Sequence, residues 1–178
     1  MMLSTRRAAA AFVAALALGA GTGALAGDQK NWTPPAHKIY GQVLADETMA
    51  AHPELLSVTL HGVPPGMHDT YTMFAGSFPE RIGNADDPDD IDVSKKGSTI
   101  LDPRWHRDHD PARKFVVLMP MRDAAGENIG LVVYAFKAPS GNRDTGPVEL
   151  DYARRAIALR DALQKRIPRY DALFAPAK

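Results

Sequence analysis

The chain has 178 residues, 21 basic and 21 acidic side chains, and no cysteine. The balanced charge argues against a nucleic-acid-binding protein, which usually carries a basic excess. The missing cysteine excludes disulfides, thiolate metal sites, c-type haem attachment and a cysteine nucleophile. A chain of this length is expected to fold as one domain.

Residues 1–26 are expected to form a cleavable secretory signal peptide. An apolar run over residues 8–20 follows Arg6 and Arg7. Ala24-Leu25-Ala26 then supplies small residues at the positions that signal peptidase reads. The alternative is an uncut N-terminal anchor, but the apolar run is short for a membrane span. The arginine pair is also a weak signal for twin-arginine export, because no Phe-Leu follows it. We therefore expect a soluble protein of the periplasm or the medium.

The first half of the mature chain is predicted to contain a lead-in, a helix and two strands. Residues 27–37 are polar and contain Pro34-Pro35, which indicates a flexible segment. Residues 38–51 have helical character. Residues 55–61 show the period of a half-buried strand, and residues 70–75 are rich in β-forming side chains. The alternation in the first strand places Leu56, Val58 and Leu60 on one face and Ser57, Thr59 and His61 on the other.

The second half contains the clearest signals. Residues 76–97 are rich in glycine, proline and aspartate and are interpreted as an irregular middle, followed by a short strand at 99–101. Residues 114–121 and 129–136 predict a β-hairpin. Residues 147–167 predict a helix. Its apolar stripe at helical spacing consists of Tyr152, Ala156, Leu159, Leu163 and Ile167.

This order of elements predicts one α+β domain over residues 38–175. It would contain about five antiparallel strands, with one helix before the sheet and one after it. The order does not alternate strands and helices in the way of a doubly wound parallel sheet.

Several segments resemble the Cache (PDC) family of extracytoplasmic sensor domains. The matching segments are the helix before His52-Pro53-Glu54, the strand ending at His61, the loop 62–69, Ile82-Gly83, the acidic run 86–92 and residues 118–130. The last of these, LMPMRDAAGENIG, is the most specific and is similar to the "lPl.D..G..IG" hairpin that these domains use for their final two strands. The resemblance extends over residues 38–174.

The resemblance implies a PAS-like antiparallel sheet with a ligand pocket between the sheet and residues 76–113. The side chains expected to reach such a pocket are His61 and Tyr71 from the strands, with Arg81, Arg104 and Trp105 from the middle. Arginine forks, hydrogen-bond donors and an aromatic wall suit a small organic anion or an amphiphile. For each residue taken alone, a structural role in the core or at the surface is the simpler interpretation.

The chain differs from the usual receptors of this family. No transmembrane helix and no signalling region follows the domain in the sequence. The expected protein is therefore a free-standing, sensor-like binding domain that acts with a separate membrane signalling or transport protein. No nucleic-acid partner, no cofactor and no stable membrane insertion after signal cleavage are expected.

One cluster of potential metal ligands, at residues 106–110, gives an alternative function, a periplasmic metal-binding protein. His106 and His109 are three residues apart, with Asp108 and Asp110 beside them, and on one helical turn they could share a Zn²⁺ or Cu²⁺ ion. The acidic run of Asp86, Asp87, Asp89, Asp90 and Asp92 could bind Ca²⁺. Its spacing is not that of an EF-hand, so a solvated loop is favoured.

Enzyme signatures are mostly absent. The sequence has no Gly-x-Ser-x-Gly elbow, no phosphate-binding glycine loop and no dinucleotide fingerprint. This favours a protein that is not an enzyme. An unrecognised hydrolase assembled from scattered residues is the third hypothesis, and it would require a base and a nucleophile within reach of each other in a cleft.

Overall fold

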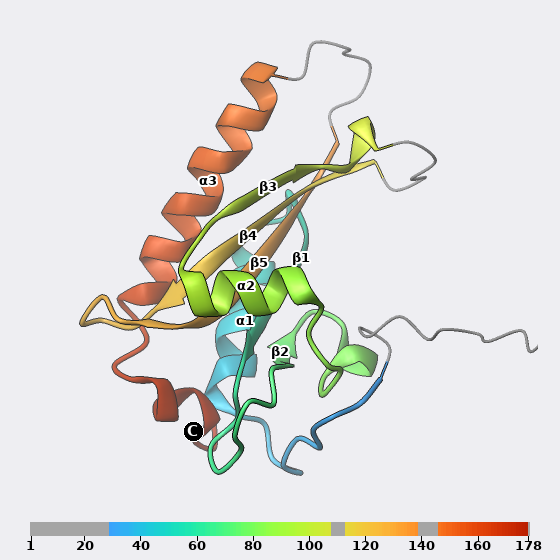
Figure 1. Cartoon of the computed structure of the whole chain (residues 1–178). Coiled ribbons are helices and arrows are strands. Elements are labelled where there is room, and N and C mark those ends of the chain that lie inside the picture. Colours follow the sequence, from blue (N-terminus) through green and yellow to red (C-terminus); the bar gives the residue numbers. More distant parts are fainter. Residues whose placement is uncertain (1–28, 108–112, 139–145, 178) are drawn as a thin grey trace, which may run out of the picture.

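An antiparallel sheet of five strands lies at the centre of the protein (Figure 1). The structure is a computed structural model and describes residues 29–107, 113–138 and 146–177. The strands are β1 (Leu55–Gly62), β2 (Thr72–Gly76), β3 (Ile100–Pro103), β4 (Lys114–Arg122) and β5 (Asn128–Lys137). The helices are α1 (Tyr40–Ala51), α2 (Pro88–Lys96) and α3 (Gly146–Gln164), with short 3-10 helices η2 (Pro79–Arg81), η3 (Arg104–His106) and η4 (Tyr170–Phe174). Across the sheet the strands follow the order β2-β1-β5-β4-β3.

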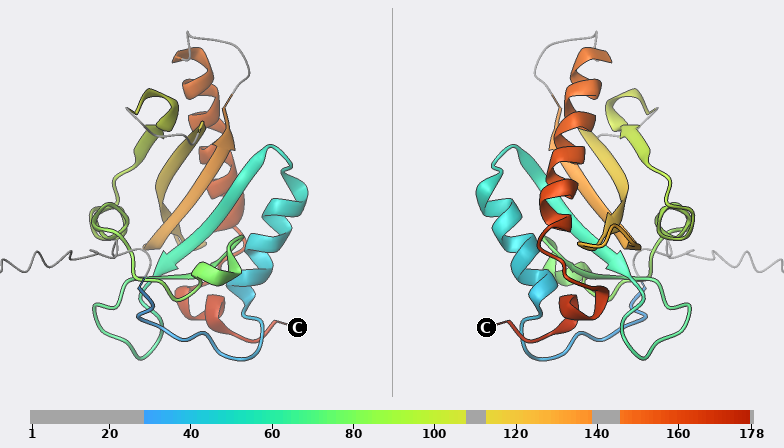
Figure 2. Two further views of the ribbon diagram at one scale, coloured as in Figure 1. Left: turned by 90° about the vertical axis from the view of Figure 1, so that its right-hand side faces the viewer. Right: turned by 90° about the vertical axis from the view of Figure 1, so that its left-hand side faces the viewer.

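Helices cover both faces of this sheet (Figure 2). Helices α1, α3 and η4 pack on one face, where the larger core contains the buried aromatic side chains Phe74, Phe115, Tyr134 and Phe136. Helix α2 lies on the opposite face. The smaller core beneath it consists of Val93, Val116, Leu118, Leu131 and Ala135. The central strands are therefore buried on both sides.

The α+β fold with a PAS-like sheet, one helix before it and one after it is confirmed. The hairpin is also confirmed: β4 and β5 pair from Lys114↔Lys137 to Arg122↔Asn128. The turn between them is closed by the side chain of Asp123, whose Oδ1 accepts hydrogen bonds from the main-chain N–H groups of Ala125 (2.9 Å) and Glu127 (3.1 Å).

The C-terminal helix packs by its predicted stripe. Ala156, Leu159, Leu163 and Ile167 are all buried, and the Tyr152 ring stacks on Phe136 with 4.9 Å between ring centroids. Helical spacing of apolar residues buries one side of a helix, and here that side meets the sheet.

The sequence interpretation of β1 was wrong about which faces are buried. Leu56 is 40% exposed, whereas Ser57, Thr59 and His61 are buried. The reason is that α2 and η2 cover the polar face of a strand expected to be half-buried, so Val58 and Leu60 contact one core while the polar side chains lie beneath the other layer.

The interpretation of residues 76–97 as irregular was also wrong, and the acidic run is not a loop, although Asp87, Asp89 and Asp92 are exposed as expected. Pro88 opens α2 at its first position, and Gly97 closes it in the left-handed conformation with φ 66°. The main-chain N–H of Asp87 donates to Asp90 Oδ2 (3.4 Å), as in a capping box. The aspartates therefore begin a helix, and Asp86 in front of it is buried.

The segment before α1 contacts the loop that precedes α2. The carbonyl oxygen of Gly83 accepts hydrogen bonds from the main-chain N–H groups of Asn31 (2.8 Å) and Trp32 (3.2 Å). The ammonium of Lys30 donates to the carbonyl oxygens of Glu80 and Ile82. Within the three described ranges, no helix is both long enough and apolar enough to cross a membrane.

Candidate functional site

A row of polar side chains lies on the face of β1 that α2 covers. Ser57, Thr59 and His61 are two residues apart along the strand, so they project to the same side of the sheet. All three are buried. Buried polar side chains normally have hydrogen-bond partners, so three of them in a row on a covered face of a sheet call for an explanation. We therefore take this row as the candidate site.

A cavity of about 120 Å³ lies over the row. Its floor is the apolar surface of Val116, Leu118, Val133 and Ala135, and its walls are Ser57, Thr59, His61, Phe78, Arg81, Asp87, Asp90, Arg104 and Lys114. The cavity thus combines an apolar floor with charges of both signs. A larger groove of about 510 Å³ between α1 and the C-terminal segment is lined mainly by alanine and proline, and its Arg166 is already paired with Glu47.

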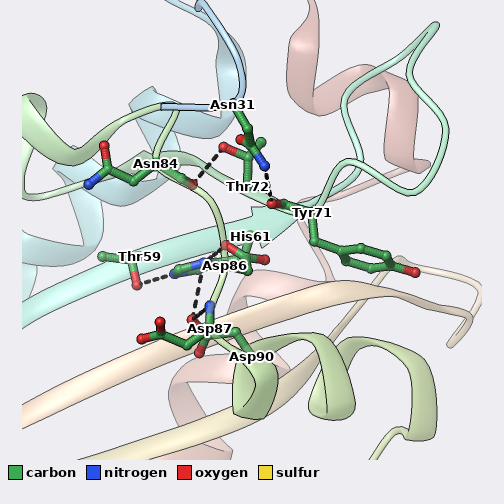
Figure 3. Close-up of polar contacts among 9 residues, drawn as sticks. All are labelled: Asn31, Thr59, His61, Tyr71, Thr72, Asn84, Asp86, Asp87 and Asp90. Carbon is green, nitrogen blue, oxygen red and sulfur yellow. Dashed lines mark hydrogen bonds and ion pairs between the residues drawn. The ribbon is translucent and has the colours of Figure 1, made fainter. Parts of the chain in front are cut away.

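Both nitrogens of the His61 ring have close partners (Figure 3). Nδ1 lies 2.7 Å from Oδ1 of Asp86, and Nε2 lies 2.7 Å from the hydroxyl oxygen of Thr59. The nearest oxygen of Asp90 is 4.0 Å from Nδ1. The ring is therefore held in one orientation between β1 and the start of α2.

The two carboxylates raise the pKa of His61. Burial by itself lowers that pKa, but the charge and the hydrogen bond of Asp86, together with the charge of Asp90, outweigh burial and the opposing charge of Arg81. Burial raises the pKa of Asp90, against the attraction of His61. Both shifts favour the protonated forms, that of His61 because of the neighbouring carboxylates and that of Asp90 because of burial.

Two arginines reach the cavity from different segments. Arg81 is the last residue of η2, and its guanidinium carbon lies 5.7 Å from the ring centroid of Phe78. Arg104 opens η3, where its Nε donates to Oδ2 of Asp102 (3.0 Å). Arg107 donates to the same oxygen (2.7 Å), so Asp102 fixes Arg104 at the rim of the cavity.

Three of the five residues expected to bind a ligand, His61, Arg81 and Arg104, line this one cavity. Tyr71 does not: its ring points away from His61 (Figure 3) and lies under the Lys95 ammonium, 5.0 Å from its centroid. Trp105 packs on the other face of the sheet, where its ring stacks on Phe115 at 5.6 Å. Its buried indole N–H has no hydrogen-bond partner among the described residues.

The proposed His/Asp metal segment falls largely outside the described residues. Asp108, His109 and Asp110 lie in the undescribed range, so nothing structural bears on them. His106 ends η3, and its Nε2 lies 2.9 Å from Oε1 of Glu149.

Sequence reasoning missed the partners of His61. Asp86 and Asp90 were considered as parts of a solvated run, and Thr59 and Lys114 were not considered as site residues. One signal could have found Thr59, because it shares the period of Ser57 and His61. Nothing in local spacing links His61 to an aspartate 25 residues further along the chain.

No protein-family model and no curated protein matches the chain. Among solved structures, it is similar to the second GAF domain of DevS from Mycobacterium smegmatis, with 12% identity over 70% of this chain and 91% of that chain and a TM-score of 0.44. It is also similar to the sensor domain of DcuS from E. coli, with 18% identity over 66% and 71% of the two chains and a TM-score of 0.37. The inducer-binding domain of PobR from Acinetobacter, in complex with 3-hydroxybenzoic acid, gives 9% identity over 72% and 95% and a TM-score of 0.39. The likeness is loose and extends to the fold alone.

Proposed function

We propose that this chain is an exported, sensor-like domain that binds a small organic anion in the cavity between β1 and α2. The observation that supports this function is the convergence of Arg81 and Arg104, from two separate segments, on one cavity. A guanidinium matches a carboxylate with two parallel hydrogen bonds, which gives both affinity and orientation.

The size and lining of the cavity favour a short ligand. Its volume of about 120 Å³ is well below the roughly 300–1,000 Å³ of pockets for drug-sized ligands. The apolar floor would hold a short carbon chain, and the hydroxyls of Ser57 and Thr59 are further hydrogen-bonding groups. A long amphiphile or a nucleotide would not fit this space. His61 is a wall of the site rather than a free donor, since both ring nitrogens are occupied.

The test is a thermal-shift screen of the mature chain against small mono- and dicarboxylates and sulfonates. We expect at least one of these anions to raise the melting temperature, because a ligand that binds only the folded state stabilises it. Arg81→Ala and Arg104→Ala should each weaken the affinity for that anion about tenfold to a hundredfold, because each removes at least one charge-assisted hydrogen bond. The rise in melting temperature should decrease accordingly.

Arg107→Ala is the matched control, because Arg107 contacts the same Asp102 carboxylate but does not line the cavity. This variant should bind the anion like the parent chain. If the anion still raises the melting temperature of both Arg81→Ala and Arg104→Ala, the anion binds at another surface. The groove beside Arg166 is then the next place to examine.

Export and release would place this domain in the periplasm or the medium, where a separate membrane signalling or transport protein would receive the ligand signal. The expected mature N-terminus is at or near Gly27. N-terminal sequencing of protein recovered from the periplasm tests this, and a membrane-bound form that keeps Met1 would contradict it.

Hydrolysis is a second candidate function, favoured by one observation. Asp86, His61 and the Thr59 hydroxyl are joined in series by two contacts of 2.7 Å. In that order an imidazole can take a proton from a hydroxyl while a carboxylate orients the ring. Turnover of activated esters that disappears in Thr59→Val would support this function, and equal turnover in both proteins would exclude it.

A further inference from the structure

Three potential metal ligands from three positions in the fold meet beside the proposed anion cavity. His61 lies on β1, Asp86 precedes α2, and Asp90 lies in the first turn of α2. One ligand atom from each lies within 4.8 Å of the other two (Figure 3). Cation sites in proteins are built in this way, from imidazole nitrogen and carboxylate oxygen brought together by tertiary contacts.

Asp86 supplies a second, independent observation. Its side chain is 0% exposed, and its Oδ2 has no hydrogen-bond partner among the described residues. A buried carboxylate oxygen without a partner is costly, because it has lost its hydration and gained nothing in return. A cation beside Asp86 would remove this cost.

The orientation of His61 fits a ligand role. When Nε2 carries the proton, it donates to the Thr59 hydroxyl 2.7 Å away and leaves the Nδ1 lone pair facing the two aspartates. Metal-binding histidines are commonly fixed through a hydrogen bond from the second ring nitrogen. A cation on Nδ1 would replace the proton that Nδ1 shares with Asp86 in the cation-free protein, and Nε2 would then donate to Thr59, which keeps Nδ1 aimed at the two aspartates.

We propose that His61, Asp86 and Asp90 form a binding site for one divalent transition-metal cation of the Zn²⁺ or Mn²⁺ type. The two positive charges of the ion balance the two negative charges of the carboxylates, so a buried site with a neutral imidazole becomes neutral overall. The imidazole ligand disfavours Ca²⁺ and Mg²⁺, which prefer all-oxygen sites. Three protein ligands leave positions open toward the cavity, where water or a bound anion completes the coordination.

Arg81 separates this inference from the proposed anion binding. It lines the cavity and its charge opposes positive charge on His61, so it helps an anion and repels a cation. Arg81→Ala should therefore lose the anion-dependent thermal shift while its affinity for Zn²⁺ stays equal or rises. The thermal shift therefore tests the anion proposal and the Zn²⁺ affinity tests the cation proposal, so that one can fail without the other.

The experiment is calorimetric titration of the tag-free mature chain with ZnCl₂ and MnCl₂ after chelator treatment, with CaCl₂ as a comparison. We expect one ion per chain for the transition metals. Asp90→Asn should weaken binding at least about 100-fold, the upper range for residues that only support a ligand. Asp89→Asn, an exposed neighbour on the same helix turn, should bind like the parent.

Asp90→Asn keeps an oxygen that can accept from the Asp87 N–H, so the start of α2 should survive, and circular dichroism checks this. Nitrogen-15 resonances of the His61 ring provide the second readout: Zn²⁺ should shift Nδ1 and leave Nε2 protonated. Zn²⁺ affinity that is unchanged in Asp90→Asn, or His61 signals that do not respond at saturation, would overturn the site.

Discussion

Gly130 packs so closely against the backbone of His61 that a Cβ atom at position 130 would overlap the His61 carbonyl oxygen. Gly130 also has φ 147°, a conformation that side-chain-bearing residues rarely adopt. The close pairing of β1 with β5 next to the candidate site therefore requires a glycine here.

Gly130→Ala should destabilise the protein by more than the roughly 1–3 kcal/mol typical of backbone strain alone, because the overlap adds to the strain. The control is Gly66→Ala, with φ 81° and no atom within 4 Å of the added Cβ. Urea unfolding of both variants measures the difference. If both variants lose the same free energy of unfolding, β1 and β5 can move apart at this point to accommodate the added Cβ atom.

Leu163→Ala should cost about 2–5 kcal/mol, the range for a buried leucine that leaves a cavity. Leu163 is 6% exposed and belongs to the larger core, whereas Ile157 on the same helix is 43% exposed. Ile157→Ala should therefore change stability by well under half of that amount. Chemical denaturation of the pair tests whether α3 is docked as the structure has it.

The hairpin and α3 could be predicted because their signals are local. A turn between two β-rich runs and a stripe at helical spacing are both complete within about 20 residues. The buried side of the helix, with Ala156, Leu159 and Leu163, could be predicted without knowing that it packs on the sheet, because it follows from the helical period of the apolar residues alone.

The site could be predicted only in part, because its contacts are not local. Arg81, Arg104 and His61 were named from chemistry and a family resemblance, and these three line one cavity. The contact between Asp86 and His61 joins residues 25 positions apart, which no spacing rule connects. Trp105 was misplaced because η3 turns its ring toward Phe115 on the opposite face of the sheet.

Asp123→Ala should destabilise the β4–β5 hairpin by about 1–3 kcal/mol, because it leaves two turn N–H groups without their acceptor. The acceptor is Oδ1, which takes hydrogen bonds from Ala125 and Glu127, and the Asp123 side chain is buried. Asp123→Asn keeps an oxygen at this position and should recover most of the loss. Amide exchange at Ala125 and Glu127 reports the two bonds directly. Equal losses in both variants would show that the charge, rather than the acceptor, stabilises the turn.

Tyr134 should make the protein sensitive to alkali. Burial raises the pKa of its phenol above the usual value, with Arg160 opposing and Asp161 adding to the shift, and the residue is 1% exposed. Above a pH of about 10 the unfolded chain loses a phenol proton that the native state keeps, so the free energy of unfolding decreases as pH rises. Below that pH both states bind the proton and Tyr134 contributes no slope. Tyr134→Phe should therefore have a shallower decline above pH 10 and an unchanged slope between pH 7 and 9. Urea unfolding across this range gives both slopes, and identical alkaline slopes in the two proteins would show that the buried phenol does not control the transition.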